Sequence, residues 1–278
     1  MSEDFADLFA PDGIQDGPVF TDLQDVQIRD IQWLDRPFLP WGELVTMNAD
    51  GDTGKGLFAV FHAARLSRAR RMAVFASAED RVETVLKPRL IAAGADLRYI
   101  RGVSWKRRGT NDALRIPNDI PELERALIDI HASMLVIDPL LSHISAKTDS
   151  YVDHQVKLAL MPLLTLAHRT GCLVLGNGHF TKSKSAGARI AVLGSGAFTN
   201  TPRVALAMAV DVFQPAVRVV GVIKSNVGPK NVVRRYTIGT RHVPGLSEDQ
   251  PLLLAAPKTA DENIDEVLQG TSSNGWHG

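Results

Sequence analysis

From Gly42 onward, short apolar runs bounded by turn residues alternate with longer stretches in which apolar positions recur at helical spacing. This alternation predicts βαβ units, and therefore an α/β fold with a mainly parallel, twisted sheet flanked by helices. The final strands follow one another without an intervening helix, which predicts antiparallel strands at the C-terminal end of the sheet. The predicted strands are 44–48, 72–76, 99–101, 134–137, 172–176, 204–210, 217–223 and 232–238, and the predicted helices are 55–67, 81–93, 120–131 and 152–169.

The two ends of the chain lack this periodicity. Residues 1–30 are acidic, with Arg29 as their one basic residue, and this composition predicts a mobile arm. Apolar clusters around Phe5 and Phe20 fit docking on a neighbouring subunit or loose packing on the chain's own domain, and both alternatives stay open. After Pro244 the periodicity is lost again. The sequence therefore predicts a flexible arm at 1–30, a folded domain at 31–244 and a polar C-terminal tail at 245–278.

Composition agrees with a folded protein. The chain has 278 residues, of which 45% are hydrophobic and 22% charged, and its formal net charge is zero, so nucleic-acid binding would need local patches. The single cysteine, Cys172, excludes an internal disulfide framework and a cysteine-rich zinc site, and it fits a buried thiol in a reducing compartment. No apolar run approaches the ~18 residues of a membrane span, and the acidic N-terminus lacks signal-peptide order. We expect a cytoplasmic protein without membrane contact.

The segment 49–56, Ala-Asp-Gly-Asp-Thr-Gly-Lys-Gly, lies between a predicted strand and a predicted helix. A phosphate-binding loop needs this order, because backbone N–H groups at a helix start then face phosphate oxygens while a lysine spans the outer phosphates. Ala49 replaces the first glycine of the pattern G-x-x-x-x-G-K-[ST], and Gly56 replaces the hydroxyl residue that ligates Mg²⁺. The alternative is a glycine-rich turn with a chance Gly-Lys pair. We interpret the segment as an ATP-binding loop formed by Asp50, Gly51, Asp52, Thr53, Gly54, Lys55 and Gly56.

Two predicted strands are followed by acidic residues. Asp138 ends the apolar run 134–137, as in a Walker B element, at the sheet edge where open α/β folds bind ligands. We expect it to hold Mg²⁺ through water, although an aspartate that forms a turn before proline would look the same. Glu79 follows the strand 72–76 and is expected to polarise the attacking water, with Asp80 as the cap of the next helix. The alternative is that both acids only start that helix.

At these residues the chain resembles the RecA-like P-loop ATPases related to the plasmid hexameric helicase RepA, to DnaB-type helicases and to RadA/RecA recombinases, in the compact version common in actinobacteria and their phages. The resemblance covers roughly residues 33–228 and depends on the order and spacing of short segments rather than on any one of them. These segments are Trp33-Leu34, the loop around Lys55 with 63–66, 77–80, Pro88-Arg89-Leu90, 92–96, 136–139, 178–183, 193–198 and Lys224-Ser225-Asn226.

The resemblance implies a RecA-like ATPase domain at 31–244 that acts in DNA replication or recombination, with ATP and Mg²⁺ as cofactors and a hexameric, helicase-like ring as the assembly. It also implies that Glu79 activates water and that His179 senses the γ-phosphate and couples it to DNA-contacting loops. Arg203 and Lys224 are implied to reach the nucleotide of an adjacent subunit. From the residues alone, His179 fits a structural histidine equally well. Gly56 departs from the family pattern, which affects the expected catalytic rate more than nucleotide binding.

Two local basic patches are candidates for contact with DNA. Lys182, Lys184, Arg189 and Arg203 lie without an acid among Ser and Gly residues, which suits the phosphate backbone of single-stranded DNA. The second patch adds a tryptophan that could stack on a base, and it consists of Arg101, Trp105, Lys106, Arg107, Arg108 and Arg115. Solvated surface loops are the alternative for both. Neither patch has the spacing of a sequence-specific reader.

Three functions remain open from the sequence. The leading one is a Mg²⁺-dependent, DNA-stimulated ATPase. A nuclease on the same scaffold is the second, with Glu79, Asp80, Asp138, Asp149, Asp153 and His179 as possible metal ligands. A nucleotide-binding scaffold that does not hydrolyse ATP is the third, and Gly56 favours it because the usual Mg²⁺-ligating hydroxyl is missing.

Overall fold

The computed structural model describes residues 20–107, 109–145, 148–150, 152–179, 196–230, 232–260 and 264, with 256–260 described by their backbone only. The chain divides into two units, Met1–Asp30 and Ile31–Gly278. In the first unit, the described residues 20–30 contain one 3-10 helix, Leu23–Asp25, and their side chains are exposed. Among the residues described, no helix combines the length and the apolar composition that crossing a membrane requires.

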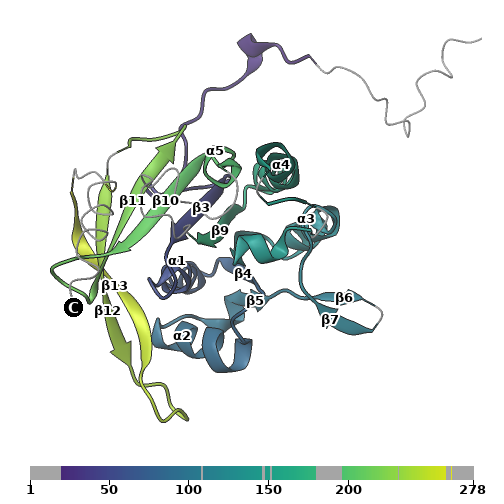
Figure 1. Ribbon diagram of the computed structural model, residues 1–278. Helices are drawn as coiled ribbons and strands as arrows, with labels where there is room; N and C mark the ends of the chain where they lie inside the picture. The colour runs from purple at the N-terminus through teal and green to yellow at the C-terminus, as the bar shows by residue number, and fades with distance from the viewer. Residues whose placement is uncertain are drawn as a thin grey trace, which may run out of the picture. The chain divides into compact units, whose positions relative to one another are not determined.

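The second unit is built on a nine-stranded sheet with the order β13-β12-β11-β10-β3-β9-β8-β4-β5 (Figure 1). From β10 to β5 each neighbouring pair is parallel, whereas β10, β11, β12 and β13 pair antiparallel. The predicted α/β class and the antiparallel C-terminal end are therefore confirmed. The strands are β3 (Leu44–Ala49), β4 (Met72–Ser77), β5 (Ile100–Gly102), β8 (Ala132–Asp138), β9 (Leu173–His179), β10 (Val204–Val210), β11 (Val217–Ser225), β12 (Val233–Arg241) and β13 (Gln250–Ala260).

Helices cover both faces of the parallel part of the sheet (Figure 1). α1 (Lys55–Arg68) and α2 (Lys87–Ala92) pack into one hydrophobic cluster, whereas α3 (Ile120–Asp129) and α4 (Asp153–Thr170) pack into the other. Alternate residues of β3 contribute to the two clusters: Val45 and Met47 belong to the first and Leu44 to the second. A strand that is buried on both faces shows a nearly continuous apolar run, which is why the central strands were predictable.

The predicted helix 81–93 is present but not uniform. It starts with a π-helical turn, η3 (Val82–Leu86), in which the backbone N–H of Leu86 donates to the carbonyl of Arg81, and it continues as α2. Pro88 lies in the first turn of α2, where its missing N–H costs little. The change of hydrogen-bond register therefore falls just before the proline.

The strand β13 corrects the predicted C-terminal tail, because residues 250–260 are part of the sheet. β13 pairs antiparallel with β12 along nearly its whole length, and Leu252 and Leu253 are buried. No strand was predicted here, because successive leucines interrupt the alternation and Pro251 lowers the strand propensity. Proline is tolerated here because β13 lies at the edge of the sheet.

Two small two-stranded sheets complete the described structure. β1 (Trp33–Asp35) pairs with β2 (Leu39–Pro40), and β6 (Trp105–Arg107) pairs with β7 (Thr110–Asp112). The β6–β7 hairpin projects from the second unit beyond β5 (Figure 1). This hairpin carries part of the second basic patch. The ion pairs of its arginines therefore determine whether that patch is free to contact DNA.

Candidate nucleotide-binding site

The loop between β3 and α1 has the conformation that phosphate binding requires. Gly54 has φ of 104°, a left-handed conformation that side chains rarely adopt, and α1 begins directly after it. The hydroxyl of Thr53 donates to the carbonyl of Asp50 at 2.9 Å, which closes the loop on itself. No side-chain hydrogen bond caps α1 at its N-terminus. The first backbone N–H groups of the helix are therefore available to an anion.

Lys55 is the first residue of α1, and its ammonium lies against the backbone of this loop. Its Nζ donates to the carbonyls of Ala49 at 3.1 Å and Asp50 at 2.8 Å, and it lies 3.4 Å from Nδ1 of His179. Burial lowers the pKa of the Lys55 ammonium, and the carboxylates led by Asp138 oppose this shift. A phosphate that enters the loop would replace weak carbonyl acceptors by charged oxygens, so the geometry favours an anionic ligand.

Asp138 ends β8 on the same edge of the sheet, and an unpredicted residue orients it. The side-chain amide of Asn177, near the end of β9, donates to Oδ2 of Asp138 at 2.8 Å. Burial raises the pKa of Asp138, and the hydrogen bond from Asn177 counteracts it. Asn177 is completely buried, and its Oδ1 has no partner in the described part of the chain. Asn177 was not predicted as a site residue, although a lone amide directly after the apolar run 173–176 was a usable signal.

Glu79 follows β4, the strand next to β8, and its side chain is exposed. Its charge acts on both Asp138 and Lys55, raising the pKa of each, as one of several smaller contributions after burial. The parallel register places Ser77 opposite Asp138, so the residues after the two strand ends meet at one edge. The structure thus brings together Lys55, Glu79, Asp138 and His179, which the sequence had singled out separately.

The predicted capping role of Asp80 is wrong. The N-cap residue of η3 is Arg81, and neither this position nor the start of α2 has a side-chain cap hydrogen bond. The carboxylate of Asp80 instead accepts a hydrogen bond from Arg89 at 2.9 Å. The π-helical start moves the N-cap position to Arg81. An acidic residue just before a helical pattern therefore did not identify the cap correctly.

Arg218, near the start of β11, holds the loop from the side and was not predicted. Its Nε donates to the carbonyl of Thr53 at 2.6 Å, and its guanidinium also donates to the carbonyl of Pro215 at 2.6 Å. Burial lowers the pKa of this guanidinium. A lone arginine in the otherwise apolar strand 217–223 was the available signal. Because Thr53 precedes the left-handed Gly54, Arg218 fixes the part of the loop where the backbone must turn.

We expect Arg218→Met to weaken ATP binding about tenfold, the effect of losing one hydrogen bond from a charged donor to the loop. Isothermal calorimetry measures the change. Arg98→Met is a suitable control, since Arg98 is exposed and pairs with Asp96 in its own turn. Equal ATP affinities of both variants and the unaltered protein would show that Arg218 does not organise the loop.

Arg203 and Lys224 lie elsewhere in this chain. The backbone N–H of Arg203 donates to the carbonyl of Leu44 at the beginning of β3, whereas the loop with Lys55 follows the opposite end of that strand. Its Nε lies 4.0 Å from Glu43, and Nζ of Lys224 donates to the carbonyl of Asn200 at 3.1 Å. The structure therefore does not place either residue beside this chain's own loop. Their action on the nucleotide of a neighbouring subunit stays a prediction.

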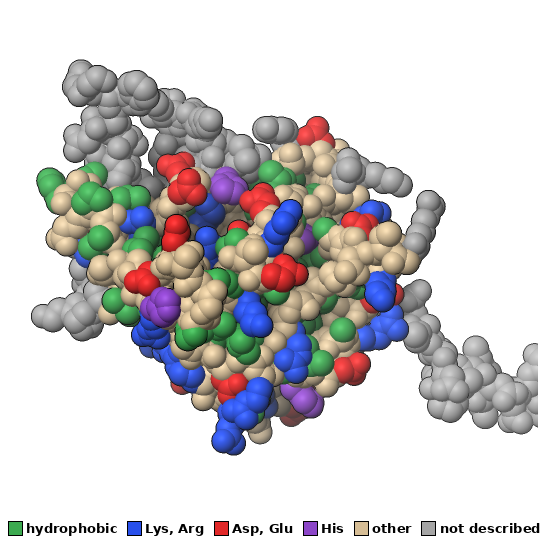
Figure 2. Space-filling view, turned by 90° about the horizontal axis from the view of Figure 1, so that it is seen from below, with side chains coloured by type: hydrophobic (Ala, Val, Ile, Leu, Met, Phe, Trp, Pro, Cys, Tyr) green, Lys and Arg blue, Asp and Glu red, His purple; other side chains and the backbone are tan. Residues whose placement is uncertain are grey.

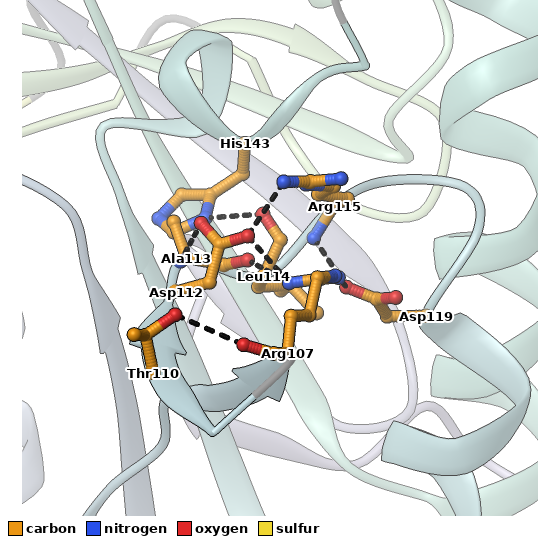
Figure 3. A network of polar contacts seen from close by, with 8 residues as sticks. All are labelled: Arg107, Thr110, Asp112, Ala113, Leu114, Arg115, Asp119 and His143. Atoms are coloured by element: carbon orange, nitrogen blue, oxygen red, sulfur yellow. Dashed lines mark hydrogen bonds and ion pairs between the residues drawn. The ribbon is translucent and has the colours of Figure 1, made fainter.

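The structure describes the second basic patch but not the three residues predicted to bind DNA in the first. Lys182, Lys184 and Arg189 lie outside the described residues. In the second patch, Arg107 forms ion pairs with Asp112 and Asp119, and Arg115 pairs with Asp112 (Figure 3). These acids engage both guanidinium groups, so these two residues do not offer a free basic surface. On the face seen in Figure 2, basic and acidic side chains are likewise mixed.

The donors at the loop fit a Mg²⁺ ion that is held mainly by the nucleotide. Asp138 offers a carboxylate, and a Cβ placed at Gly56 would lie 3.5 Å from its Oδ2, so the carboxylate faces the position of the missing hydroxyl. Mg²⁺ prefers such oxygen ligands together with water and phosphate oxygens. Within the described ranges, no group of three or more His, Cys, Asp or Glu is arranged to hold a metal ion. The described residues thus fit a nucleotide-dependent metal better than a protein-only metal cage.

The fold and the loop together define a P-loop protein with a RecA-like core. A family model described as AAA domain, AAA_25, matches residues 11–185, and the chain belongs to this family. The fold is similar to the solved structure titled "ATPase Domain of G40P", with a TM-score of 0.60, 14% sequence identity, and coverage of 75% of this chain and 88% of that chain. A comparison with curated proteins finds no match. In general terms, these findings support a nucleotide hydrolase.

Proposed function

We propose that the protein is a Mg²⁺-dependent ATPase that works with single-stranded DNA as an oligomeric, helicase-like motor. The observation that carries the ATPase part is the convergence of Lys55, Glu79, Asp138 and His179 at the carboxyl edge of the parallel strands. Lys55 lies 3.4 Å from His179, and Asp138 and Glu79 are close enough to act electrostatically on Lys55. This edge is where open α/β folds bind their ligands.

In the proposed mechanism, Lys55 and the N-terminus of α1 bind the outer phosphates, and Asp138 orients the metal's water ligands. Mg²⁺ supplies charge neutralisation on the phosphates when it is bound. Glu79 is exposed beside these groups and acts as the acceptor that orients and polarises the attacking water. Asn177 holds Asp138 in a fixed orientation through its 2.8 Å hydrogen bond.

His179 is the proposed link between nucleotide and DNA. Besides its contact with Lys55, it lines a pocket together with Asn48, Leu140 and Phe198. A side chain that contacts both Lys55 and this pocket would respond to the γ-phosphate and transmit the response to the segment that follows β9. That segment contains Lys182, Lys184 and Arg189, the proposed DNA contacts.

Oligomerisation is proposed from the separation of Arg203 and Lys224 from this chain's own loop. Arg203 directly precedes β10 and contacts the beginning of β3, and Lys224 lies near the end of β11. From these positions we infer that they complete the nucleotide site of a neighbour and not their own. A hexameric ring is the arrangement that the resemblance to DnaB-type helicases favours. Sedimentation with and without ATP tests the assembly, and a monomer under all conditions would contradict it.

One experiment separates the three functions. ATP turnover is measured with and without single-stranded DNA, beside the degradation of labelled DNA in Mg²⁺. ATP turnover that rises with DNA supports the motor. DNA degradation without ATP turnover supports a nuclease. ATP binding without turnover supports the scaffold, the alternative that the absent hydroxyl at Gly56 favours.

We expect the combined change of Lys182, Lys184 and Arg189 to alanine to weaken binding of single-stranded DNA and to flatten its salt dependence. Three lost phosphate contacts reduce the slope of log K against log salt concentration by about 2, since each contact on a single strand contributes ~0.7. Fluorescence anisotropy of a labelled oligonucleotide measures the slope. A charge-matched control changes Lys87, Arg98 and Lys157, which are exposed on other elements. An equal slope in both variants would contradict the assignment.

A further inference from the structure

Arg89 approaches the start of α1 from a different element. It lies on α2, between the buried residues Pro88 and Leu90, which fix its backbone against the core. A Cβ placed at Gly56 would lie 3.7 Å from a terminal nitrogen of Arg89 and 3.5 Å from Oδ2 of Asp138. A guanidinium and a carboxylate thus converge on the position from which P-loop proteins present a Ser or Thr hydroxyl.

This guanidinium is only partly used by the protein. Asp80 accepts one hydrogen bond from it at 2.9 Å, and arginine has five N–H donors. In the described part of the chain, Arg89 has no second acceptor within hydrogen-bonding distance. The side chain is 29% exposed and that of Asp80 is 38% exposed, so the pair is open to a ligand on one side.

The excess of negative charge around the phosphate loop would be offset by a cation in addition to Lys55. Asp80, Glu79 and Asp138 are acidic neighbours, and the charges of Asp80 and Glu79 raise the pKa of Asp138, after the larger effect of burial. A bound nucleotide adds further negative charge. Lys55 is the cation on the loop itself, and Gly56 supplies no ligand that would fix a metal. Arg89 is the additional positive charge at this point.

We propose that Arg89 is a phosphate-binding residue of the same subunit, whose guanidinium donates to an outer phosphate oxygen of the nucleotide and provides part of the charge neutralisation that a hydroxyl-anchored metal would provide. Gly56 and Arg89 are then a compensating pair. This inference rests on the proposed ATP binding. It explains how the site could tolerate glycine at position 56 and still bind ATP.

The test compares ATP affinity in Mg²⁺ and in EDTA by isothermal calorimetry. We expect Arg89→Met to weaken ATP binding in EDTA about tenfold or more, the effect of losing a charged donor, and in Mg²⁺ by a smaller factor of about three. Arg89→Lys should recover part of the loss, because it retains the charge without the planar fork. The exposed Arg98 gives the control, and Arg98→Met should leave both affinities unchanged.

The ratio of the two losses distinguishes phosphate binding from a structural role. If Arg89 only held Asp80 and α2 in place, Arg89→Met would weaken binding by the same factor in Mg²⁺ and EDTA, and the proposal would be overturned. Unchanged ATP affinity in both conditions would also overturn it. Lys55→Ala, measured in parallel, keeps the proposed function separate: if neither variant alters binding, the P-loop assignment itself fails.

Two further variants test the compensating pair, and the first of them does not depend on the folding of Arg89→Met. Asp80→Asn removes the competing carboxylate, so ATP binding in EDTA should tighten about threefold; weaker binding would contradict the proposal. The 3.5 and 3.7 Å distances leave ordinary contact space for the Cβ of Gly56→Ser. In the Gly56→Ser background, Arg89→Met should cost less affinity in Mg²⁺ than in the unaltered protein. An equal or larger cost would argue against compensation.

Discussion

Lys55→Ala is expected to weaken ATP binding about a hundredfold or more, because it removes a charged donor from the outer phosphates in a site with few other cations. The folded protein should survive the change. Burial already lowers the pKa of this ammonium, which means that the isolated charge is poorly solvated in the folded state. Removing it relieves that cost while leaving the carbonyls of Ala49 and Asp50 without one of their donors. The two effects oppose each other, so we expect little change in thermal stability without nucleotide.

The measurement uses calorimetry for affinity and thermal unfolding with and without ATP. Ligand binding to the native state raises the melting temperature, so the ATP-induced rise should disappear in Lys55→Ala. Lys157→Ala, an exposed lysine of α4, is the matched control and should retain the full rise. An undiminished ATP affinity of a folded Lys55→Ala variant would contradict the P-loop assignment, and the proposed function with it.

The fold was largely predictable because its central strands carry local signals. β3, β8 and β9 are buried on both faces, so their continuous apolar runs identify them without knowledge of their neighbours. β13 carries no such signal. Its place depends on pairing with β12, an interaction between segments that only the folded chain brings together. An edge strand with a proline and successive leucines has no periodicity to detect.

The candidate site was predictable only where its residues have a fixed position relative to a strand end. Lys55 follows β3 in a loop of defined spacing, and Asp138 ends β8, so both could be found along the sequence. Arg218 contacts a carbonyl that lies 165 positions away in sequence, and Asn177 contacts Asp138 across 39 positions. No local sequence pattern indicates contacts between residues so far apart along the chain. Sheet order determines them, because β11 and β9 reach the site only through their neighbours in the sheet.

The second large effect is expected for Glu79→Gln, which should retain ATP binding and slow hydrolysis by ~10²–10⁴, the usual consequence of losing a positioned base. Glutamine has nearly the same size and still forms hydrogen bonds, but it cannot accept the proton or polarise water as a carboxylate does. Glu79 is exposed, so the fold should be unaffected. ATP affinity should stay equal or rise slightly, because a negative charge near the phosphates is removed.

Single-turnover hydrolysis with and without single-stranded DNA measures this effect and separates it from binding. Glu83→Gln, an exposed glutamate four residues further along in η3, is the matched control and should hydrolyse ATP at the unaltered rate. The hydrolysis rate of Glu79→Asp should lie between those of Glu79→Gln and Glu83→Gln. Aspartate keeps the carboxylate, but its side chain is one methylene shorter and holds the carboxylate farther from the water. If Glu79→Gln hydrolyses ATP at the same rate as Glu83→Gln, Glu79 only forms part of the turn that precedes η3. Another acid at this edge must then activate the water, and Asp80 becomes the candidate, because its carboxylate lies beside Arg89 and acts on Asp138.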